Sequence, residues 1–345
     1  MRQFQFSIVL YFAFFCSAVF SQTYTVTDLG TLPNGVTSGA SAINALGQAT
    51  GNSDMGFSTP LHAFLWSGSL GMRDLGTLAA GQSSLGYGIN SHAVVAGGST
   101  LLVNSQVVEH AFVWTKTKGM QDLGTLPGGS NSRATGVIDA GQIVGRSDFN
   151  GGTITHGFLW TQKNGMVDLG TLPGGSASVA AAINKTGLLV GSCDAHACLW
   201  TGSKGAQDLG TLTGGNVSAA MGINGIAQVV GWSATGSSFA HAFLWTKTGG
   251  MQDLGTLPGG TLSISNGINS AGTVVGYSDQ NNQFGINHAF VWTVTGGMQD
   301  LNSLIPAGFG WSLTYANAIN DAGQIVGIGT VLGSTHAFLL TPAAH

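Results

Sequence analysis

The chain has 345 residues, of which 56 are glycine and only 7% are charged, and its formal net charge is −4 at pH 7. Frequent glycine together with recurrent Val, Ile, Thr, Phe and Trp is typical of short strands joined by tight turns and argues against a helix-rich globular protein. The ten Lys and Arg residues are scattered along the chain, so no basic patch could neutralise several phosphates and we expect no nucleic-acid partner.

Residues 1–21 are predicted to be a secretory signal peptide. An apolar run extends from Phe6 to Phe20, and Val19 and Ser21 occupy the −3 and −1 positions of a cleavage site. The run is about 15 residues long, whereas a membrane span needs roughly 20. We therefore expect a protein with no membrane span after cleavage, secreted to the extracellular space or the periplasm.

Three short motifs recur seven times in the rest of the chain. The first is Asp-Leu-Gly-Thr-Leu, which ends the series as Asp-Leu-Asn-Ser-Leu and is spaced by 40 to 48 residues. The second is His-Ala-Phe-Leu-Trp or a close variant, and the third has the form Gly-Ile-Asn-x-x-Gly-x-Val-Val-Gly. The repeat Asp residues are Asp28, Asp74, Asp122, Asp168, Asp208, Asp253 and Asp300. The repeat His residues are His62, His110, His156, His196, His241, His288 and His336.

Each repeat contains four runs with strand character, namely the stretch ending in Ile-Asn, the Val-Val-Gly stretch, the His-Ala-Phe-Leu-Trp motif and the stretch ending in Asp-Leu. Asn and Gly between the first two runs predict a tight hairpin closed by an Asx turn. Four antiparallel strands in a repeat of this length correspond to one propeller blade. We therefore predict an all-β fold, a seven-bladed β-propeller with four-stranded blades. A β-solenoid is the alternative, but it normally uses shorter coils and needs end caps.

The two ends of the mature chain carry complementary strands. The chain starts at Tyr24 with the fourth strand of a repeat and stops at Leu340 with the third strand of another. Pairing these strands would complete one blade, close the ring and leave no strand edge unpaired. We therefore predict closure between the N- and C-terminal strands, and a single seven-repeat domain over residues 22–345.

The three motifs resemble those of the bacterial HAF family of extracellular repeat proteins, and the resemblance extends from Tyr24 to Leu340. It implies an extracellular location and this type of repeat, but no activity and no set of binding residues. The sequence departs from the pattern at single positions, for example Ile138 where Asn is usual and Cys198 where Phe is usual.

Most ionisable residues belong to the repeat, since seven of the 14 acidic residues and seven of the nine His residues recur in it. Recurrence in every blade indicates a structural role, so we expect buried His and Asp side chains to hydrogen-bond across neighbouring strands rather than to form a ring of metal ligands or general bases. The sequence contains no visible pair of glycosidase carboxylates, Gly-x-Ser-x-Gly elbow, His-Glu-x-x-His helix, phosphate loop or EF-hand loop. We therefore predict no catalytic residue, no metal site and no cofactor.

Cys193 and Cys198 are the two cysteines of the mature chain. They can form a disulfide in an oxidising compartment, or they can serve as small buried apolar residues, and both interpretations stay open. The segment between them looks like a metal site, but its His196 belongs to the repeat.

The connections between the second and third strands vary most in length, from 5 residues (Gly191 to His196) to 13 residues (Gly97 to His110). Insertions in repeat proteins collect on one face, which is often the binding face. These loops also carry acidic and aromatic residues, whereas Lys116 and other lysines lie in the opposite hairpins. The candidate ligand-binding residues are Asp148, Phe149, Asp194, Trp232, Tyr277, Asp279 and Phe284, of which the first three are expected to converge.

The leading hypothesis is therefore a secreted, noncatalytic binding or surface-interaction propeller, monomeric, with a carbohydrate or protein ligand at the variable-loop face. One alternative is an extracellular polysaccharide hydrolase or lyase built on a propeller scaffold. The other is a structural component of the cell envelope.

Overall fold

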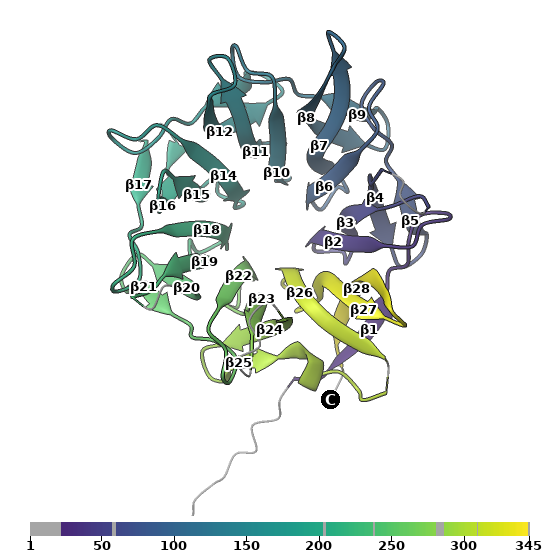
Figure 1. The fold of residues 1–345 in the computed structure, drawn as a ribbon, viewed down its shortest axis with the longest axis vertical. Helices are drawn as coiled ribbons and strands as arrows, with labels where there is room; N and C mark the ends of the chain where they lie inside the picture. Colours follow the sequence, from purple (N-terminus) through teal and green to yellow (C-terminus); the bar gives the residue numbers. More distant parts are fainter. Residues whose placement is uncertain are drawn as a thin grey trace, which may run out of the picture.

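The structure is a computed structural model that describes residues 22–56, 60–202, 205–236, 239–280, 286–308 and 310–343. The predicted signal peptide lies outside the described residues. The strands form seven four-stranded antiparallel sheets arranged in a ring (Figure 1). The predicted all-β, seven-bladed β-propeller is therefore confirmed, and the solenoid alternative is wrong.

The blades are numbered from the first complete sheet in the chain. Blades 1 to 3 comprise β2 (Ser38–Ile43), β3 (Ala49–Ser53), β4 (His62–Ser67), β5 (Gly71–Asp74), β6 (Ser84–Ile89), β7 (Val95–Val103), β8 (Gln106–Thr115), β9 (Gly119–Asp122), β10 (Ser132–Val137), β11 (Ile143–Phe149), β12 (Ile154–Thr161) and β13 (Gly165–Asp168). Blades 4 to 6 comprise β14 (Ser178–Ile183), β15 (Leu189–Cys193), β16 (His196–Trp200), β17 (Ala206–Asp208), β18 (Ser218–Ile223), β19 (Val229–Ala234), β20 (Ala240–Thr246), β21 (Gly250–Asp253), β22 (Ser263–Ile268), β23 (Val274–Asp279), β24 (Asn287–Thr293) and β25 (Gly297–Asp300). Blade 7 comprises β26 (Trp311–Ile319), β27 (Ile325–Val331), β28 (Ser334–Pro342) and β1 (Tyr24–Asp28), and a short 3-10 helix, η2 (Leu301–Ser303), precedes it.

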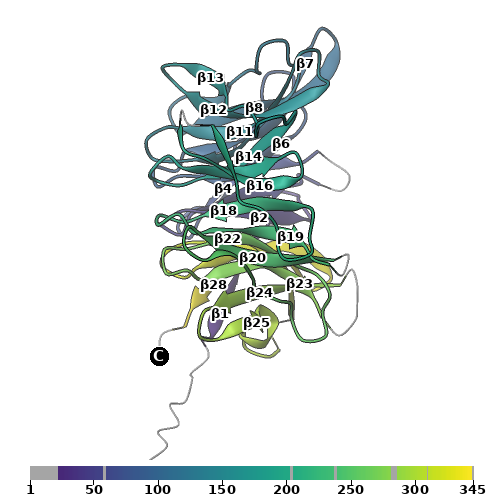
Figure 2. The same cartoon turned by 90° about the vertical axis from the view of Figure 1, so that its left-hand side faces the viewer.

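In every blade the first strand lies nearest the axis and the fourth lies outermost (Figure 1). Figure 2 shows the ring edge-on, with its blades seen as thin stacked sheets. Because the strands are antiparallel, one face of the ring carries the loops between second and third strands together with the connections between blades; we call it the variable-loop face. The other face carries the tight turns and is called the hairpin face. No helix in the described part of the chain is long and apolar enough to cross a membrane.

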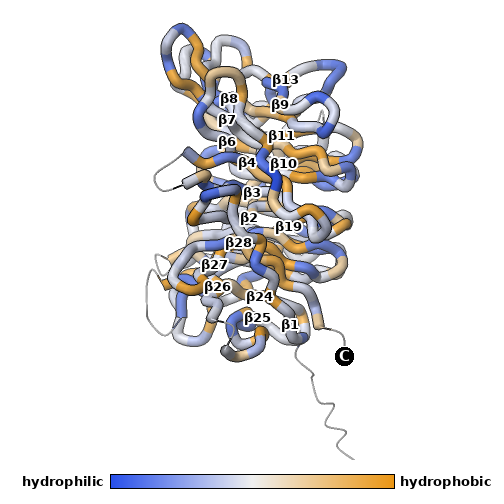
Figure 3. The backbone as a smooth tube through the Cα atoms, turned by 90° about the vertical axis from the view of Figure 1, so that its right-hand side faces the viewer, coloured by the Kyte–Doolittle hydropathy of each residue, from blue (hydrophilic) through white to orange (hydrophobic). Residues whose placement is uncertain are grey.

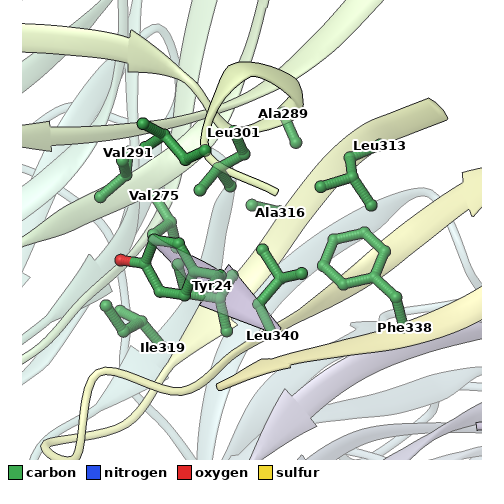
Figure 4. Packing of buried hydrophobic residues seen from close by; sticks show 12 residues of the cluster. Tyr24, Val275, Ala289, Val291, Leu301, Leu313, Ala316, Ile319, Phe338 and Leu340 are labelled. Atoms are coloured by element: carbon green, nitrogen blue, oxygen red, sulfur yellow. The ribbon is translucent and has the colours of Figure 1, made fainter. Parts of the chain in front are cut away.

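Buried apolar side chains fill the interfaces between neighbouring blades. The repeat Phe is fully buried in six blades, and Cys198 is fully buried at the same position of blade 4. Figure 4 shows one interface, in which Val275 and Val291 of blade 6 belong to the same cluster as Leu313 and Phe338 of blade 7. Buried and more accessible residues alternate along strands such as β6, and Figure 3 shows hydrophilic and hydrophobic segments interspersed along the backbone. Each blade therefore relies on both neighbours to bury its two faces.

The glycine of the Val-Val-Gly motif is required by a β-bulge in the first strand. In blade 1 the register shifts between Ala40 and Ala42, and Gly51 of the second strand lies opposite Ala40. A Cβ on Gly51 would collide with the carbonyl oxygen of Gly39, and the equivalent glycine of every other blade meets the same obstacle. Glycine occurs in this motif because the backbones of two strands lie close together there, and not because the chain turns.

Side-chain hydrogen bonds also join successive blades. Ser84 of blade 2 accepts a hydrogen bond from the backbone N–H of Ala63 in blade 1 (2.8 Å), and its hydroxyl donates to the carbonyl oxygen of Gly76 (2.6 Å). Serines at the equivalent position of blades 1 and 3 to 6 make the same two bonds. Each such serine satisfies a buried backbone donor across a blade interface.

The repeat Asn forms a second, ring-shaped set of bonds at the hairpin face. The Oδ1 atom of Asn44 accepts the N–H groups of Leu46 and Gln48 (both 3.0 Å), which is the predicted Asx turn. Its Nδ2 atom donates to the carbonyl oxygen of Asn90 in the next blade (2.9 Å). The Nδ2 atoms of five further residues donate in the same way to a backbone carbonyl oxygen of the next blade, and the last of them donates to Asn44. These residues are Asn90, Asn184, Asn224, Asn269 and Asn320. Ile138 of blade 3 has no amide, so the ring of bonds is broken between blades 3 and 4.

The N- and C-terminal strands close the ring. β1 pairs antiparallel with β28, from Tyr24 opposite Pro342 to Asp28 opposite Phe338. The purple β1 lies among the yellow strands of the C-terminus in Figure 1. Tyr24 is buried in the cluster that contains Phe338 and Leu340 (Figure 4). The predicted closure is therefore confirmed.

Removing the closing strand should destabilise the whole ring. A chain that begins at Pro33 lacks β1 and the buried side chains of Leu29 and Leu32. We expect it to lose its cooperative thermal transition, or to unfold about 10 °C or more below the chain that begins at Gln22. Differential scanning calorimetry of the two forms measures this difference, and coincident transitions would show that closure adds little stability.

Restoring the missing amide should stabilise the ring. Asn at position 138 can donate to the carbonyl oxygen of Asn184 as its counterparts do in the other blades, so Ile138→Asn should be more stable than Ile138→Ala by about 1 kcal/mol. Chemical denaturation of the two variants measures the contribution of the amide group. Equal stability would mean that the hydrogen bond does not form or adds nothing to the free energy of unfolding.

Candidate functional site

The repeat His and Asp residues pair within each blade, as predicted. In blade 5 the Nδ1 atom of His241 lies 2.9 Å from Oδ2 of Asp253, which belongs to the neighbouring strand. The Asp253 carboxylate also accepts the N–H of Gly255 (2.8 Å). The expected burial is wrong, however, because the side chains of the seven His are 13–36% exposed and those of their Asp partners 18–46%. These pairs fasten the outer strands at the variable-loop face.

The loop carboxylates are committed to the backbone. Oδ1 of Asp148 accepts the N–H groups of Ser130 and Asn131 (both 2.7 Å), and Oδ2 accepts from Nδ2 of Asn131 (3.0 Å). Asp54, Asp194 and Asp279 make equivalent bonds in their own blades. Burial alone would raise the pKa of Asp148, but the hydrogen bonds from Asn131 and Ser130 outweigh it and hold that pKa below its usual value. These acids therefore tie each loop to the preceding connection.

No hydrogen bond, ion pair or ring contact joins the predicted binding residues to one another in the part of the chain that the structure describes, although Phe149 and Asp194 both lie near His156. Asp279 is fully buried, so its carboxylate does not reach the surface. Asp148 and Asp194 hold the loops of their own blades, and no hydrogen bond or ion pair joins them in the part of the chain that the structure describes. The ring of Phe149 packs on His156, with centroids 4.4 Å apart. Phe284 lies outside the described residues.

Trp232 and Tyr277 lie in second strands, two residues before the strands end. They are half-buried, occupy the same repeat position in β19 and β23, and pair with Ala219 and Ile264 of the first strands. Tyr277 packs edge-on against Tyr315 of blade 7, with ring centroids 4.8 Å apart. These two aromatic residues therefore belong to the inner part of the ring.

Cys193 and Cys198 form a disulfide, with a Cα–Cα distance of 5.9 Å. Both residues are also buried. Cys193 stands where blade 1 has Ser53, whose hydroxyl oxygen accepts the N–H of Leu32 (3.0 Å). The disulfide thus replaces part of the repeat hydrogen-bond pattern in blade 4. No group of three His, Cys, Asp or Glu residues that could hold a metal ion is present among the described residues.

A cavity of about 510 Å³ lies on the axis, between the first strands of all seven blades. Each blade contributes to its lining the residue three positions before the repeat Asn, or before Ile138 in blade 3. These residues are Ser41, Tyr87, Thr135, Ala181, Met221, Asn266 and Asn317. A smaller cavity of about 330 Å³, lined by Lys185 and the repeat Asn residues of blades 4 to 7, lies at the hairpin end of the axis.

The first cavity is bordered by a group of charged residues from blades 2 and 3. Arg133 makes two hydrogen bonds to Glu109, Nε to Oε1 at 2.8 Å and Nη2 to Oε2 at 2.7 Å. Its guanidinium carbon lies over the ring of Tyr87, 5.3 Å from the ring centroid. The hydrogen bonds to Glu109 raise the pKa of Arg133, and burial raises the pKa of Tyr87. Gly98 makes this arrangement possible, because a Cβ at that position would collide with the Glu109 carboxylate.

Arg146 also lines the cavity and, unlike Arg133, has no partner within the described ranges. It lies directly opposite Arg133 in the register of β10 and β11, and it is exposed. No described residue forms a hydrogen bond or ion pair with its guanidinium. Arg133, Arg146 and Tyr87 were not predicted as site residues, because the prediction rested on differences between loops. Comparing the accessible positions of the first two strands from repeat to repeat would have found them, since these positions vary while their neighbours recur.

No protein-family model and no curated protein matches the sequence. The fold is similar to that of the extracellular domain of BT4673 from B. thetaiotaomicron, with a TM-score of 0.52 and 10% sequence identity. The match covers 94% of this chain and 41% of that one, so this chain spans less than half the length of that protein. This similarity shows a shared fold.

Two weaker matches cover nearly the whole of both chains. One is a mutant of AofleA from Arthrobotrys oligospora, with a TM-score of 0.36 and 11% identity over 94% of each chain. The other is a mutant of the Aleuria aurantia lectin AAL in complex with Fucalpha1-6GlcNAc, with a TM-score of 0.33 and 11% identity over 93% of this chain and 96% of that one.

The repeat His should contribute modestly to stability. Because the pair of His241 and Asp253 is partly exposed, His241→Ala should lower the free energy of unfolding by about 1 kcal/mol. The matched control is His92→Ala, which removes a looser and more exposed pair with Asp139, 3.4 Å apart. That control should change stability by less than about 0.5 kcal/mol. Denaturation midpoints compare the two, and equal effects would refute the structural role of the repeat pair.

Proposed function

We propose that this protein is a secreted, noncatalytic propeller of the HAF type that binds a small ligand in its axial cavity. The observation that carries the proposal is the contrast between the structural residues, which recur in the blades, and the residues that line the axial cavity. The bulge glycines, the bridging serines and the His–Asp pairs recur around the ring, whereas the residues that face the cavity differ from blade to blade. The seven equivalent lining positions hold six different residue types, with Asn repeated at 266 and 317. Such a lining presents an asymmetric surface, which recognition of an asymmetric small molecule requires.

The hydrogen bonds that the carboxylates accept support a binding function rather than hydrolysis or elimination. All 14 acidic residues accept hydrogen bonds. Seven are bonded to the repeat His, four to loop backbone, Glu109 to Arg133, and Asp139 and Asp321 to serines. The described residues that line the cavity include no carboxylate, imidazole or thiol. A pair of carboxyl groups facing a substrate, as glycoside hydrolysis normally uses, has no counterpart there.

Size and lining favour a ligand of sugar size. The volume of about 510 Å³ falls within the range of roughly 300–1,000 Å³ that small-molecule sites occupy. The hydroxyl groups of Ser41 and Ser192 have no hydrogen-bond partner among the described residues, and Met221 is 39% exposed. Free hydroxyls beside accessible apolar surface suit a molecule that has both hydroxyl groups and C–H faces. The axis thus replaces the variable-loop face as the proposed binding surface.

Filling the cavity should abolish binding without unfolding the protein. Ala181→Trp places an indole among the lining residues, and Val294→Trp places the same side chain in an exposed turn as a matched control. In saturation-transfer NMR with a panel of neutral and acidic mono- and disaccharides, at least one sugar should bind the unmodified protein and Val294→Trp. The same sugar should not bind Ala181→Trp, while the melting temperature stays within about 3 °C. Binding that survives in Ala181→Trp, or a panel without any binder, would contradict the proposal.

A further inference from the structure

In the part of the chain that the structure describes, the axial cavity carries one positive charge without an acidic partner. Both oxygens of Glu109 are used by Arg133, so that pair is neutral as a unit. Arg146 lies beside this pair with no acidic partner among the described residues. The described lining contains no other charged side chain. The cavity is therefore locally cationic in a chain whose formal net charge is −4.

The placement of the two arginines is costly without a counter-ion. Arg133 and Arg146 are direct partners across antiparallel strands. Like charges in such positions repel one another and destabilise the sheet. Glu109 relieves the repulsion for Arg133, and Gly98 provides the space it needs. An anion bound at Arg146 would relieve the remaining repulsion in the same way.

The chemistry of the free group favours a carboxylate. A guanidinium is planar, and its N–H donors can engage both oxygens of a carboxylate at once. Because Arg146 is exposed in the cavity, these donors are open to a ligand that enters it. One net positive charge matches a monoanion, whereas a phosphate monoester would bring a second negative charge without a partner. Ser192 occupies the position of Arg146 in the adjacent blade, where its free hydroxyl can meet a neighbouring hydroxyl of the ligand.

We propose that the axial cavity binds a monocarboxylate of the sugar-acid class, with Arg146 engaging its carboxylate. The proposal rests on the proposed function, because it specifies the ligand of the same cavity. Arg146 acts by direct contact with the ligand. Arg133 is held by Glu109, lies over the ring of Tyr87 and keeps the neighbouring strand in place.

Isothermal titration with glucuronate and galacturonate tests the charge requirement. Glucuronamide, which has nearly the same shape and no charge, is the matched neutral probe, and inorganic phosphate is the competing anion. At least one uronate should bind, on the order of tenfold more tightly than glucuronamide. Its affinity should fall as salt is raised, since the interaction is ionic. Phosphate binding more tightly than either uronate would overturn the assignment of a carboxylate.

Variants of Arg146 test the residue. Arg146→Gln removes the charge and should weaken uronate binding about tenfold or more, whereas Arg146→Lys keeps the charge without the paired donors and should weaken it less. Lys116→Gln removes a positive charge from an exposed hairpin and should leave binding unchanged. None of the three variants should be less stable than the unmodified protein, because Arg146 has no partner to lose among the described residues and Lys116 is exposed.

The outcomes separate the two proposals. The sugar-acid assignment would be overturned if neutral sugars bind as well as uronates, or if Arg146→Gln binds uronates as tightly as the unmodified protein. The proposal of axial binding would still stand in that case, provided that Ala181→Trp abolishes sugar binding. No binding by any sugar, neutral or acidic, would overturn both proposals.

Discussion

Seven sheets can close into a ring only if each buries one face against the preceding blade and the other against the next. The repeat motifs are best understood as the parts that meet this requirement. The repeat Phe is fully buried between sheets, and burial of such a side chain contributes about 2 kcal/mol. The glycine opposite the bulge lets the first two strands of a blade approach, and a serine such as Ser84 satisfies a backbone donor that the interface would otherwise leave buried and unpaired.

The fold could be predicted because its determinants repeat. A motif period of 40 to 48 residues, strand-like runs within it and complementary ends are all visible along the chain. The pairing of His241 with Asp253 was predictable for the same reason, since both recur at a constant separation. Burial of that pair was not, because it depends on how far the outer strands extend beyond the neighbouring blade.

The candidate site was harder to predict because its contacts are not repeated. Asp148 appeared available in sequence, yet it accepts two backbone N–H groups 17 and 18 residues earlier in the chain, and backbone donors leave no mark on side-chain identity. Arg133 meets Glu109 across a blade interface, over 24 residues, and only because position 98 is glycine. In a repeat protein the residues that recur reveal the frame, whereas the accessible residues that fail to recur are the better guide to binding.

The closing strand also affects how copies of this chain meet one another. β1 is joined to the rest of its blade only through hydrogen bonds and packing, and the register from Tyr24 opposite Pro342 to Asp28 opposite Phe338 would be the same with the β28 of a second molecule. Exchange of β1 between two rings would keep this register, as domain swapping requires, but it would also disturb the buried side chains of Leu29 and Leu32, which pack between blades 7 and 1 of one ring. In dilute solution the tethered strand has the advantage of high effective concentration. Exchange between rings therefore becomes competitive only where the concentration of rings is high.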